Sequence, residues 1–432
     1  MAQIGFLSLY AAGHMNPMTT LGRSLAARGH SVIFFCIADL EDKVNRNGLR
    51  AVTFAHEEFP LGSLQAITAK TSTLLGPDGL VYFIERMIAF ADASFHHLPK
   101  LIEAENLDLL VIDQLYPGGS TLAEHLNLPF ISAANATHIN REESVPPPSI
   151  PWPYDPSEEG RARNRKGWAG AAQIFSPLQQ RVNARRDTWE LPLYEDFLED
   201  SLSPHLQITQ LPREFDFPRE DAPANLHYVG PLMDEMTTAG IPFPWEWLDK
   251  DSSNARPLVY ATMGTLHNGL AEIFQAMIDA CSGLNVQAVV SLGNGSVDAS
   301  RFGKIPDNVL VVPFCPQAEL MKRATLCVAH AGLNTALDCL SNGLPMVAIP
   351  IAADQPGVAM RLAYTGTGEV IPFSQLTAPN LRTAIEKVLG DPTYRINAQR
   401  ISQEMQQLDS LIEACELIEN ALDSVAVFTS TR

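Results

Sequence analysis

The sequence predicts an α/β protein in which two doubly wound parallel sheets form two domains that face each other across a cleft. Three observations lead to this fold class. The chain has 432 residues, which is too many for one ordinary hydrophobic core. Short apolar runs with a strand pattern alternate with amphipathic helical patterns in both halves. Between the halves, residues 230–254 are polar and contain Pro and Trp, which is typical of a linker.

The first half opens with a β-α-β pattern that places two polar residues at one edge of the predicted sheet. Strand patterns lie at 3–9, 31–36, 49–55, 109–113, 128–133, 206–210 and 226–229, and helix patterns at 17–28 and 78–105. Pro17 suits a first helical turn and Gly29 a helix end. His14 lies in the predicted loop 10–16, and Asp113 ends a strand. Ligands collect at the carboxyl ends of such strands, so both residues are site candidates.

A Pro-rich segment follows at residues 145–156, VPPPSIPWPYDP. It cannot form regular structure because each proline lacks a donor and fixes φ. We interpret it as a plain surface loop, and a flap over a binding site is the alternative. A basic, helix-like run follows at 161–186.

The second half repeats the alternation of strands and helices. Strand patterns lie at 257–263, 286–292, 309–313 and 325–329, and helix patterns at 268–281, 336–341, 377–390 and 392–421. There is no short-period repeat along the chain. We therefore expect a second parallel sheet whose own carboxyl edge faces the cleft.

The strand at 325–329 is followed directly by HAGLNT, and then by a helix. A strand, a turn of small residues and a helix start direct backbone N–H groups and the positive end of the helix toward one point. His330 opens the turn, Gly332 allows close approach of a ligand, and Asn334 and Thr335 add side-chain donors. This pattern predicts an anion site.

The first strand of the same half ends at a second small-residue turn. Thr262, Gly264 and Thr265 lie at this turn and would face the same anion. An ordinary strand-end turn is the alternative. Phosphate groups of a nucleotide fit both turns.

The stretch from 314 to 361 resembles the signature of the UDP-dependent glycosyltransferases of the GT-B fold, which have two Rossmann-like domains. The matching residues are Phe314 and Gln317 of FCPQ, His330, Gly332, Asn334 and Thr335 of HAGLNT, Asp338, and Asp354 with Gln355. The wording HAGLNTALD and DQPGVA is closest to the bacterial carotenoid (zeaxanthin) glucosyltransferases. Many family members carry Trp at the place of Phe314, and the smaller ring covers less of a uracil base.

The resemblance implies a role for each remaining residue of this signature. Phe314 would stack on uracil, Gln317 would bind the edge of the base, and Asp338 would accept hydrogen bonds from ribose. Asp354 and Gln355 would bind hydroxyls of the transferred sugar. By themselves these residues have plainer interpretations: a core Phe, a solvated helical Asp, and an N-cap at Asp354.

A hydroxyl that attacks a sugar carbon needs a base whose pKa is near neutrality, which histidine provides. A carboxylate on the other ring nitrogen would fix the tautomer and stabilise the imidazolium. His14 and Asp113 suit these roles because both lie at strand ends, although a helix cap and a loop hydrogen bond would also explain them. The resemblance places AAGHMNP and LVIDQ where the family has its catalytic histidine and aspartate.

The function implied is an inverting, metal-independent transfer of a hexose, with glucose as the first expectation, from a UDP-sugar to a hydroxyl of an apolar acceptor. A carotenoid, a flavonoid and another phenol are all candidate acceptors. Two alternatives stay open: a nucleotide-sugar epimerase and a non-catalytic nucleotide-sugar binding protein of the same fold. The expected domains are 1–229 for the acceptor, 230–254 as linker and 255–392 for the nucleotide sugar. By resemblance, 393–432 crosses back to the first domain.

Composition and missing motifs exclude other classes. The formal charge of −19 argues against binding to nucleic acid or to anionic lipid. No apolar run approaches the roughly 18 to 20 residues of a membrane span, and no signal peptide is apparent. Six cysteines without a C-x-x-C motif indicate a reduced, cytoplasmic protein. No ATP or NAD fingerprint follows a strand.

No metal or tightly bound cofactor is expected, and the UDP-sugar serves as co-substrate. The Asp249-Lys250-Asp251 triplet resembles a metal-binding motif but lies in the linker. His96 and His97 are adjacent on an apolar helix, without the spacing of metal ligands. The oligomeric state cannot be inferred from the sequence.

Overall fold

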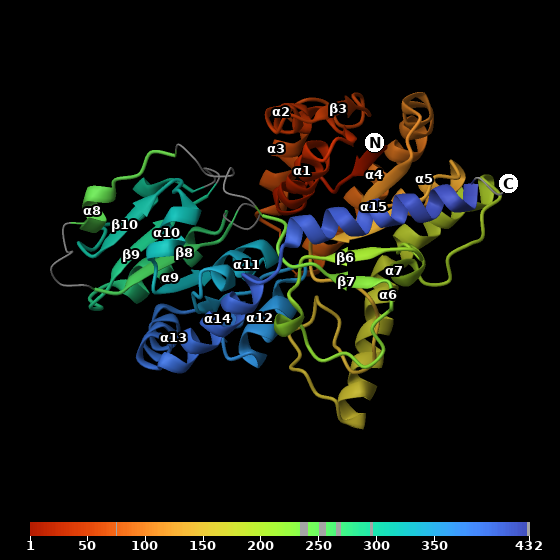
Figure 1. The fold of residues 1–432 in the computed structure, drawn as a ribbon. Helices are drawn as coiled ribbons and strands as arrows, with labels where there is room; N and C mark the ends of the chain where they lie inside the picture. Colours follow the sequence, from red (N-terminus) through yellow and green to blue (C-terminus); the bar gives the residue numbers. More distant parts are fainter. Residues whose placement is uncertain (75, 234–240, 250–255, 265–268, 294–296, 430–432) are drawn as a thin grey trace.

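The computed structural model describes residues 1–74, 76–233, 241–249, 256–264, 269–293 and 297–429. In these residues the chain forms two parallel sheets with helices packed on both (Figure 1). The predicted fold class is confirmed. Thr265, Lys250 and Asp251, named above from the sequence, lie outside the described residues.

Among the described residues, the first sheet contains seven strands in the order β3-β2-β1-β4-β5-β6-β7, all parallel. They are β1 (Gln3–Leu7), β2 (Ser31–Cys36), β3 (Arg50–Thr53), β4 (Leu109–Asp113), β5 (Phe130–Ala134), β6 (Gln207–Thr209) and β7 (Leu226–Tyr228). The helices are α1 (Ala12–Ala27), α2 (Glu41–Arg46), α3 (Ser63–Thr71), α4 (Gly76–Glu105), α5 (Gly119–His125), α6 (Glu158–Thr188) and α7 (Phe197–Asp200), with 3₁₀ turns η1 (Ala38–Leu40) and η2 (Arg213–Phe215).

The second sheet repeats this topology with six described strands in the order β10-β9-β8-β11-β12-β13. They are β8 (Leu258–Thr262), β9 (Gln287–Ser291), β10 (Val309–Val312), β11 (Leu326–Ala329), β12 (Met346–Ala348) and β13 (Gly368–Val370). The helices are α8 (Trp245–Asp249), α9 (Ala271–Cys281), α10 (Gln317–Arg323), α11 (Leu333–Ser341), α12 (Gln355–Tyr364), α13 (Ala378–Gly390), α14 (Pro392–Met405) and α15 (Ser410–Thr429), with 3₁₀ turns η4 (Ala299–Arg301) and η5 (Phe373–Gln375).

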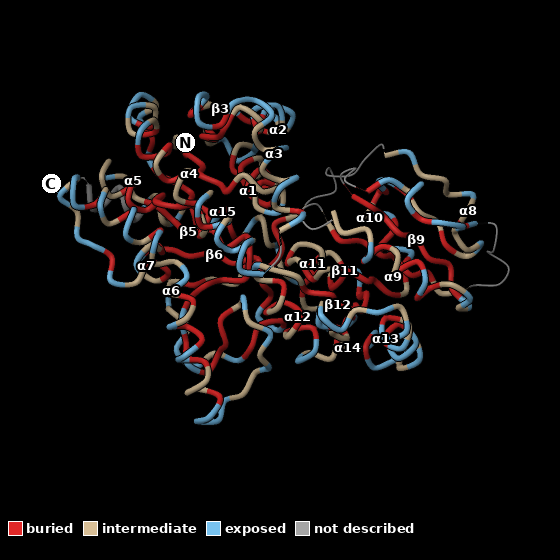
Figure 2. The backbone as a smooth tube through the Cα atoms, turned by 180° about the vertical axis from the view of Figure 1, so that it is seen from behind, coloured by how far each residue is buried: buried red, intermediate tan, exposed pale blue. Residues whose placement is uncertain are grey.

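The central strands read as continuous apolar runs because helices cover both of their faces. Every residue of β4 and β8 is buried, and Figure 2 shows the strands as buried tubes beneath more exposed helices. Along β8, Tyr260 belongs to one hydrophobic core and Ala261 to another, on the opposite face of the sheet. The carboxyl ends of the strands are therefore the places where the sheets present polar groups.

His14 was expected in a loop, and this expectation is wrong. Helix α1 begins at Ala12, so His14 lies in its first turn, and Pro17 lies inside the helix. Pro17 is the sixth residue of the helix and lies past the first turn, so it removes the intrahelical hydrogen bond that an N–H at this position would make to the carbonyl of Gly13. Its presence therefore did not mark the first turn.

The single C-terminal helix expected at 392–421 is two helices. Helix α14 packs on α11 in the second half, whereas α15 runs back across the first half and packs on α1 (Figure 1). The break lies where the chain passes Gly230: a Cβ at Gly230 would meet Ser410 Oγ at 2.7 Å and Leu408 Cδ1 at 2.9 Å. An ion pair of 2.6 Å between Arg28 and Glu419 fastens α15 to the end of α1.

A buried charge cluster joins the two halves. The Asp216 carboxylate accepts hydrogen bonds from Arg361 of α12 at 2.7 and 2.9 Å, and from Arg219 and Tyr228. His138 Nε2 lies 3.0 Å from the same carboxylate. Burial alone would raise the pKa of Asp216, but the charges of Arg361 and Arg219 hold it well below its usual range. Separating the halves here would leave buried charges unpaired, so we expect this joint to stay closed.

The Pro-rich loop at 145–156 is not the plain surface loop that its composition indicates. The N–H of Gly357, in α12, donates to the Pro148 carbonyl at 2.8 Å, and a Cβ at Gly357 would collide with that carbonyl. Tyr154 packs its ring 5.4 Å from that of Tyr364. The loop is therefore part of the contact between the halves.

Two further expectations can be compared with the described residues. Where the chain is described, no helix combines the length and the apolar character needed to cross a bilayer. All six cysteines are described; each is buried and has a free thiol, in agreement with the expectation of reduced cysteines. Within the predicted linker, the described helix α8 buries Leu248 in the core of the second half.

Candidate active site

The sequence-predicted pair His14 and Asp113 comes together at the carboxyl edge of the first sheet. Strand β4 ends at Asp113, and the loop after β1 leads into α1, which carries His14 in its first turn. The distance from His14 Nδ1 to Asp113 Oδ2 is 2.6 Å. A carboxylate accepts, so Nδ1 carries the proton and Nε2 is the basic nitrogen.

The Asp113 carboxylate is fully buried, and each of its oxygens accepts at least one hydrogen bond. Its Oδ1 accepts from Leu115 N at 2.9 Å, and its Oδ2 accepts from Asn135 Nδ2 at 2.9 Å as well as from His14. Asn135 directly follows β5, the neighbouring strand, and sequence reasoning missed it. A polar residue directly after a buried strand was the signal that could have found it.

The environment of His14 favours its protonated form. Burial alone would lower the pKa of His14, but the charge of Asp113 and its hydrogen bond raise it, and the charge of Asp354 adds to this. The net pKa therefore lies above the ordinary value of 6.5. Such a histidine can take up a proton and keep it while a reaction proceeds.

On the second sheet, glycines surround the predicted anion site. A Cβ at Gly264 would lie 2.6 Å from the His330 ring, and a Cβ at Gly332 would lie 2.5 Å from His330 Nε2. Gly264 has a φ of +65°, which also disfavours any other residue. Gly332 is the N-cap of α11 and no side chain caps this helix, so the backbone N–H groups of its first turn meet beside His330.

Three further candidate donor-binding residues of this half are Thr262, Thr335 and Asn334, and Asn334 differs from the other two because it contacts the first half. Thr262 ends β8 and its Oγ1 accepts from Gly264 N at 3.2 Å, while Thr335 lies half-buried in the first turn of α11. Asn334, also in that turn, donates its Nδ2 to the carbonyl of Gly13, at 2.6 Å, in the other half. The structure therefore brings Asn334 directly against the helix that carries His14.

Gln317 and Asp338, predicted to bind base and ribose, are bonded to each other. Gln317 Nε2 donates to Asp338 Oδ2 at 2.8 Å, and its Oε1 accepts from Tyr260 OH at 3.1 Å. Burial raises the pKa of Asp338 to about 6, although the bond from Gln317 opposes this. Phe314 follows β10 and exposes 48% of its surface, so its ring is open to stacking.

Asp354 precedes α12 but does not cap it with its side chain. Instead its Oδ2 accepts from both N and Oγ1 of Thr137, in the other half, at 2.8 and 3.2 Å. The plain interpretation as an N-cap is therefore wrong. Gln355 is buried, and its Oε1 accepts from the backbone N–H groups of Ile351 and Ala352. Thr137 is a second residue that sequence reasoning missed.

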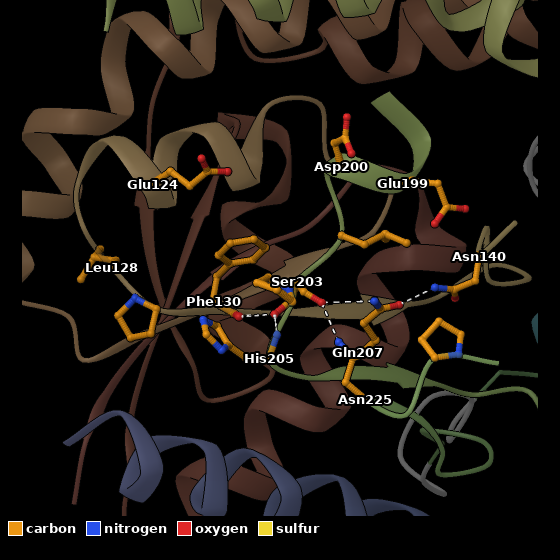
Figure 3. A pocket seen from close by; sticks show the side chains of 14 residues that line it. Glu124, Leu128, Phe130, Asn140, Glu199, Asp200, Ser203, His205, Gln207 and Asn225 are labelled. Atoms are coloured by element: carbon orange, nitrogen blue, oxygen red, sulfur yellow. Dashed lines mark hydrogen bonds between the residues drawn. The ribbon is translucent and has the colours of Figure 1, made fainter. Parts of the chain in front are cut away.

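A cavity of about 600 Å³ lies at the opposite edge of the first sheet, where β5 and β6 begin (Figure 3). Three of its polar side chains donate to backbone carbonyls of the lining: Ser203 Oγ donates to Phe130 O, and Gln207 and Asn225 donate to Ser203 O. The cavity is separate from the edge that holds His14. In the described part of the chain, no three His, Cys, Asp or Glu side chains gather as a metal site.

Residues 275–419 match the family model described as the C-terminal domain of Erythromycin biosynthesis protein CIII-like proteins. The chain is 30% identical over 417 residues to a zeaxanthin glucosyltransferase of Pseudescherichia vulneris, with 95% of both chains covered. The chain belongs to the GT-B glycosyltransferase family. A zeaxanthin glucosyltransferase of Pantoea ananas is 28% identical over 418 residues, which cover 95% of this chain and 93% of the relative.

Solved glycosyltransferases share the fold. The glycotransferase of kitacinnamycin has a TM-score of 0.75 at 21% identity, with 97% of this chain and 98% of that chain covered. The glycosyltransferase VinC, solved in complex with dTDP, has a TM-score of 0.66 at 20% identity, with coverage of 97% and 99%. The 432-residue chain is therefore a glycosyltransferase that takes its sugar from a nucleoside-diphosphate donor and transfers it to a small-molecule acceptor.

Proposed function

We propose that the protein is an inverting hexosyltransferase that moves glucose from UDP-glucose to a hydroxyl of an apolar small molecule. The observation that supports this most directly is the 2.6 Å contact between His14 and the buried Asp113. An epimerase or a binding protein of this fold has no need for a base at the acceptor side. Relatives that are named zeaxanthin glucosyltransferases support glucose as the sugar and a carotenoid as one candidate acceptor.

In this reaction the acceptor hydroxyl attacks the anomeric carbon of the sugar while Nε2 of His14 takes the hydroxyl proton. The bond from the anomeric carbon to the diphosphate oxygen breaks, and UDP leaves with the electron pair. Asp113 stabilises the imidazolium that forms, and Asn135 and Leu115 hold Asp113 in place. Attack from the face opposite to the leaving group inverts the anomeric configuration.

The second half would bind the donor. His330 and the first-turn N–H groups of α11 would bind the diphosphate and stabilise its charge as it leaves, in place of a metal. Phe314 would stack on uracil, Gln317 and Asp338 would bind base and ribose, and Thr262 and Thr265 would add hydroxyl donors. Asp354 and Gln355 would contact the sugar.

We assign residues 1–229 to the acceptor, 230–254 to the linker and 255–392 to the donor. Of the expected crossing segment 393–432, α14 packs on the donor half and α15 returns to the first half. Four exposed apolar side chains between residues 61 and 83, Leu61, Leu80, Val81 and Phe83, support an apolar acceptor on the first half. The six free thiols support a cytoplasmic location.

The test is UDP release from UDP-glucose, with dTDP-glucose in parallel, against zeaxanthin, a flavonol, a simple phenol, a sterol and a macrolide. Product NMR should show a β-glycoside formed from the α-configured donor. Retained configuration would contradict the mechanism. A preference for dTDP-glucose would change the nucleotide of the proposed donor from UDP to dTDP and leave the proposed mechanism unchanged.

The assignment of the base is tested with His14→Ala. We expect turnover to fall at least about a thousandfold, with UDP affinity within about twofold of the wild type. Unchanged turnover would remove His14 from the mechanism. Activity in EDTA should match activity without it, because no metal takes part in the proposed steps.

A further inference from the structure

In helix α1 the carbonyl of Gly13 lacks the usual donor four residues further along the chain. In an α-helix the N–H of each residue donates to the carbonyl four residues earlier. Position 17 is proline, which has no N–H, so the carbonyl of Gly13 lacks this partner. Gly13 is exposed and directly precedes His14.

Asn334, from the opposite half, bonds to this carbonyl. Its Nδ2 lies 2.6 Å from Gly13 O, and a Cβ at Gly13 would lie 3.5 Å from the same nitrogen, so the two chains are in direct contact. Asn334 is the second residue of α11, whose first turn forms the proposed diphosphate site. A carboxamide nitrogen has two hydrogens, so one can donate to Gly13 while the other donates to a phosphate oxygen.

We propose that Asn334 is a positioning residue that sets His14 against the donor sugar through the carbonyl that Pro17 leaves open. The inference rests on the function proposed above. Proton transfer and attack require the reacting atoms to be about 3 to 3.5 Å apart, and a small displacement is costly in rate. His14 belongs to α1 and the diphosphate site to α11, and this hydrogen bond joins the two helices directly.

Two other hydrogen-bonded contacts between the halves, among the described residues, lie on segments other than the helix that carries the base. Asp354 bonds to Thr137, in the segment after β5, and Arg361 bonds to Asp216 near β7. They hold the halves together but do not fix α1 itself. Of these three contacts, the bond from Asn334 to Gly13 is the one that reaches α1, and it couples the donor side to the helix of the base.

The decisive variant is Pro17→Ala, which leaves His14 and Asn334 intact. The new N–H at position 17 would donate to Gly13 O within the helix and compete with Asn334. We expect kcat to fall about tenfold, with the Kd for UDP within about twofold of the wild type. Pro99→Ala is the matched control: it makes the same change inside α4, away from the site, and should alter neither value. Circular dichroism shows whether each variant is folded.

A double-mutant cycle identifies the partner. Asn334→Ala should lower kcat and also raise the Kd for UDP, because it removes both donor hydrogens. The kcat effects of Pro17→Ala and Asn334→Ala should not add, because both remove the same bond. Fully additive effects, or a wild-type kcat in Pro17→Ala, would overturn the inference.

Hydrogen exchange gives a readout that needs no acceptor. UDP should slow exchange in the peptide that contains residues 12–16 of the wild-type protein, and should not do so in Pro17→Ala or Asn334→Ala. No effect of UDP on this peptide in the wild type would overturn the inference even if no acceptor were found. Absence of transfer with a normal exchange result would instead count against the proposed function.

Discussion

The edges of the two sheets hold their functional groups in different ways. At the first, three side chains form a bonded series, in which Asn135 and His14 both contact the buried Asp113. At the second, the backbone dominates, because Gly264 and Gly332 make room around His330 and a helix start supplies N–H groups. In the proposed function, the first edge serves proton transfer and the second binds an anion. Substitutions at the first should therefore lower turnover, and substitutions at the second should lower donor affinity.

The largest effect expected within this comparison comes from Asp113→Asn. An amide cannot stabilise the imidazolium, so kcat should fall about a thousandfold while UDP binding is kept. The base acts when neutral, so the rate falls as the pH drops through the pKa of His14. Asp113 raises that pKa and burial lowers it, so the variant should move the acidic limb of the pH profile to lower pH. The values of kcat and kcat/KM, measured from pH 5 to 9, show the loss of turnover and the shift of the acidic limb.

Two outcomes of the Asp113→Asn experiment would contradict the comparison. A large loss of UDP affinity would mean that the first edge also binds the donor. An unmoved acidic limb, with kcat lowered, would mean that the limb belongs to another group. Calorimetric titration with UDP separates these cases.

At the second edge, Gly332→Ala should reduce UDP affinity about tenfold to a hundredfold. The added Cβ would lie 2.5 Å from His330 Nε2, closer than such contacts permit, so the ring or the start of α11 must move. The catalytic pair is untouched, so kcat at saturating donor should change far less than KM. Gly303→Ala, in the same half, is the control because nothing lies within 4 Å of its Cβ. Unchanged donor KM in Gly332→Ala would remove this turn from the donor site.

The sequence sufficed for the fold class because parallel strands covered on both faces become uniform apolar runs. Residues 109–113 match β4 residue for residue. Strands β12 and β13 were not predicted, although β6 and β7, which are equally short, were. The break between α14 and α15 was also missed, because it depends on packing against Gly230, far away in the sequence.

The residues of the candidate site also divide into those that a local sequence pattern indicates and those that depend on contacts with distant residues. His14, Asp113 and the HAGLNT turn could be found because each directly follows a strand pattern or matches a signature. Asn135 and Thr137 could not be found in this way, since their importance lies in the carboxylates they contact, 22 and 217 residues away. Likewise, no local pattern indicates that Asn334 bonds to Gly13. Contacts between the halves require the three-dimensional structure.

A smaller effect should follow from Asn135→Leu, which removes one hydrogen bond from Asp113 Oδ2. The carboxylate would then hold a proton on the His14–Asp113 pair more strongly, so the acidic limb should move to higher pH, by about half a unit, opposite to Asp113→Asn. We expect kcat to fall about tenfold, a loss typical of a hydrogen bond to a charged group. The measurement is the pH profile of kcat/KM.

Ser132→Ala is the control for Asn135→Leu. Ser132 lies in β5, three residues before Asn135, and the substitution removes a buried hydrogen bond of 2.9 Å from Ser203 N, away from the carboxylate. The control should lower thermal stability without moving the limb. A purely structural role for Asn135 would give the same result in both variants.

The smallest effect concerns the pH dependence of donor binding. Burial raises the pKa of Asp338 to about 6, so this carboxylate is ionised at pH 7.5 and largely protonated at pH 5. The ionised form is the stronger acceptor for ribose hydroxyls, so UDP affinity should weaken about threefold to tenfold as the pH falls between these values. Asp338→Asn should remove this part of the pH dependence while keeping the bond partner of Gln317 in place. Calorimetric titrations of both proteins at pH 5 and pH 7.5 measure the difference. If the variant kept the full pH dependence, Asp338 would not be the titrating group, and the terminal phosphate of UDP, whose second pKa is about 6, or His330 would be the next group to test.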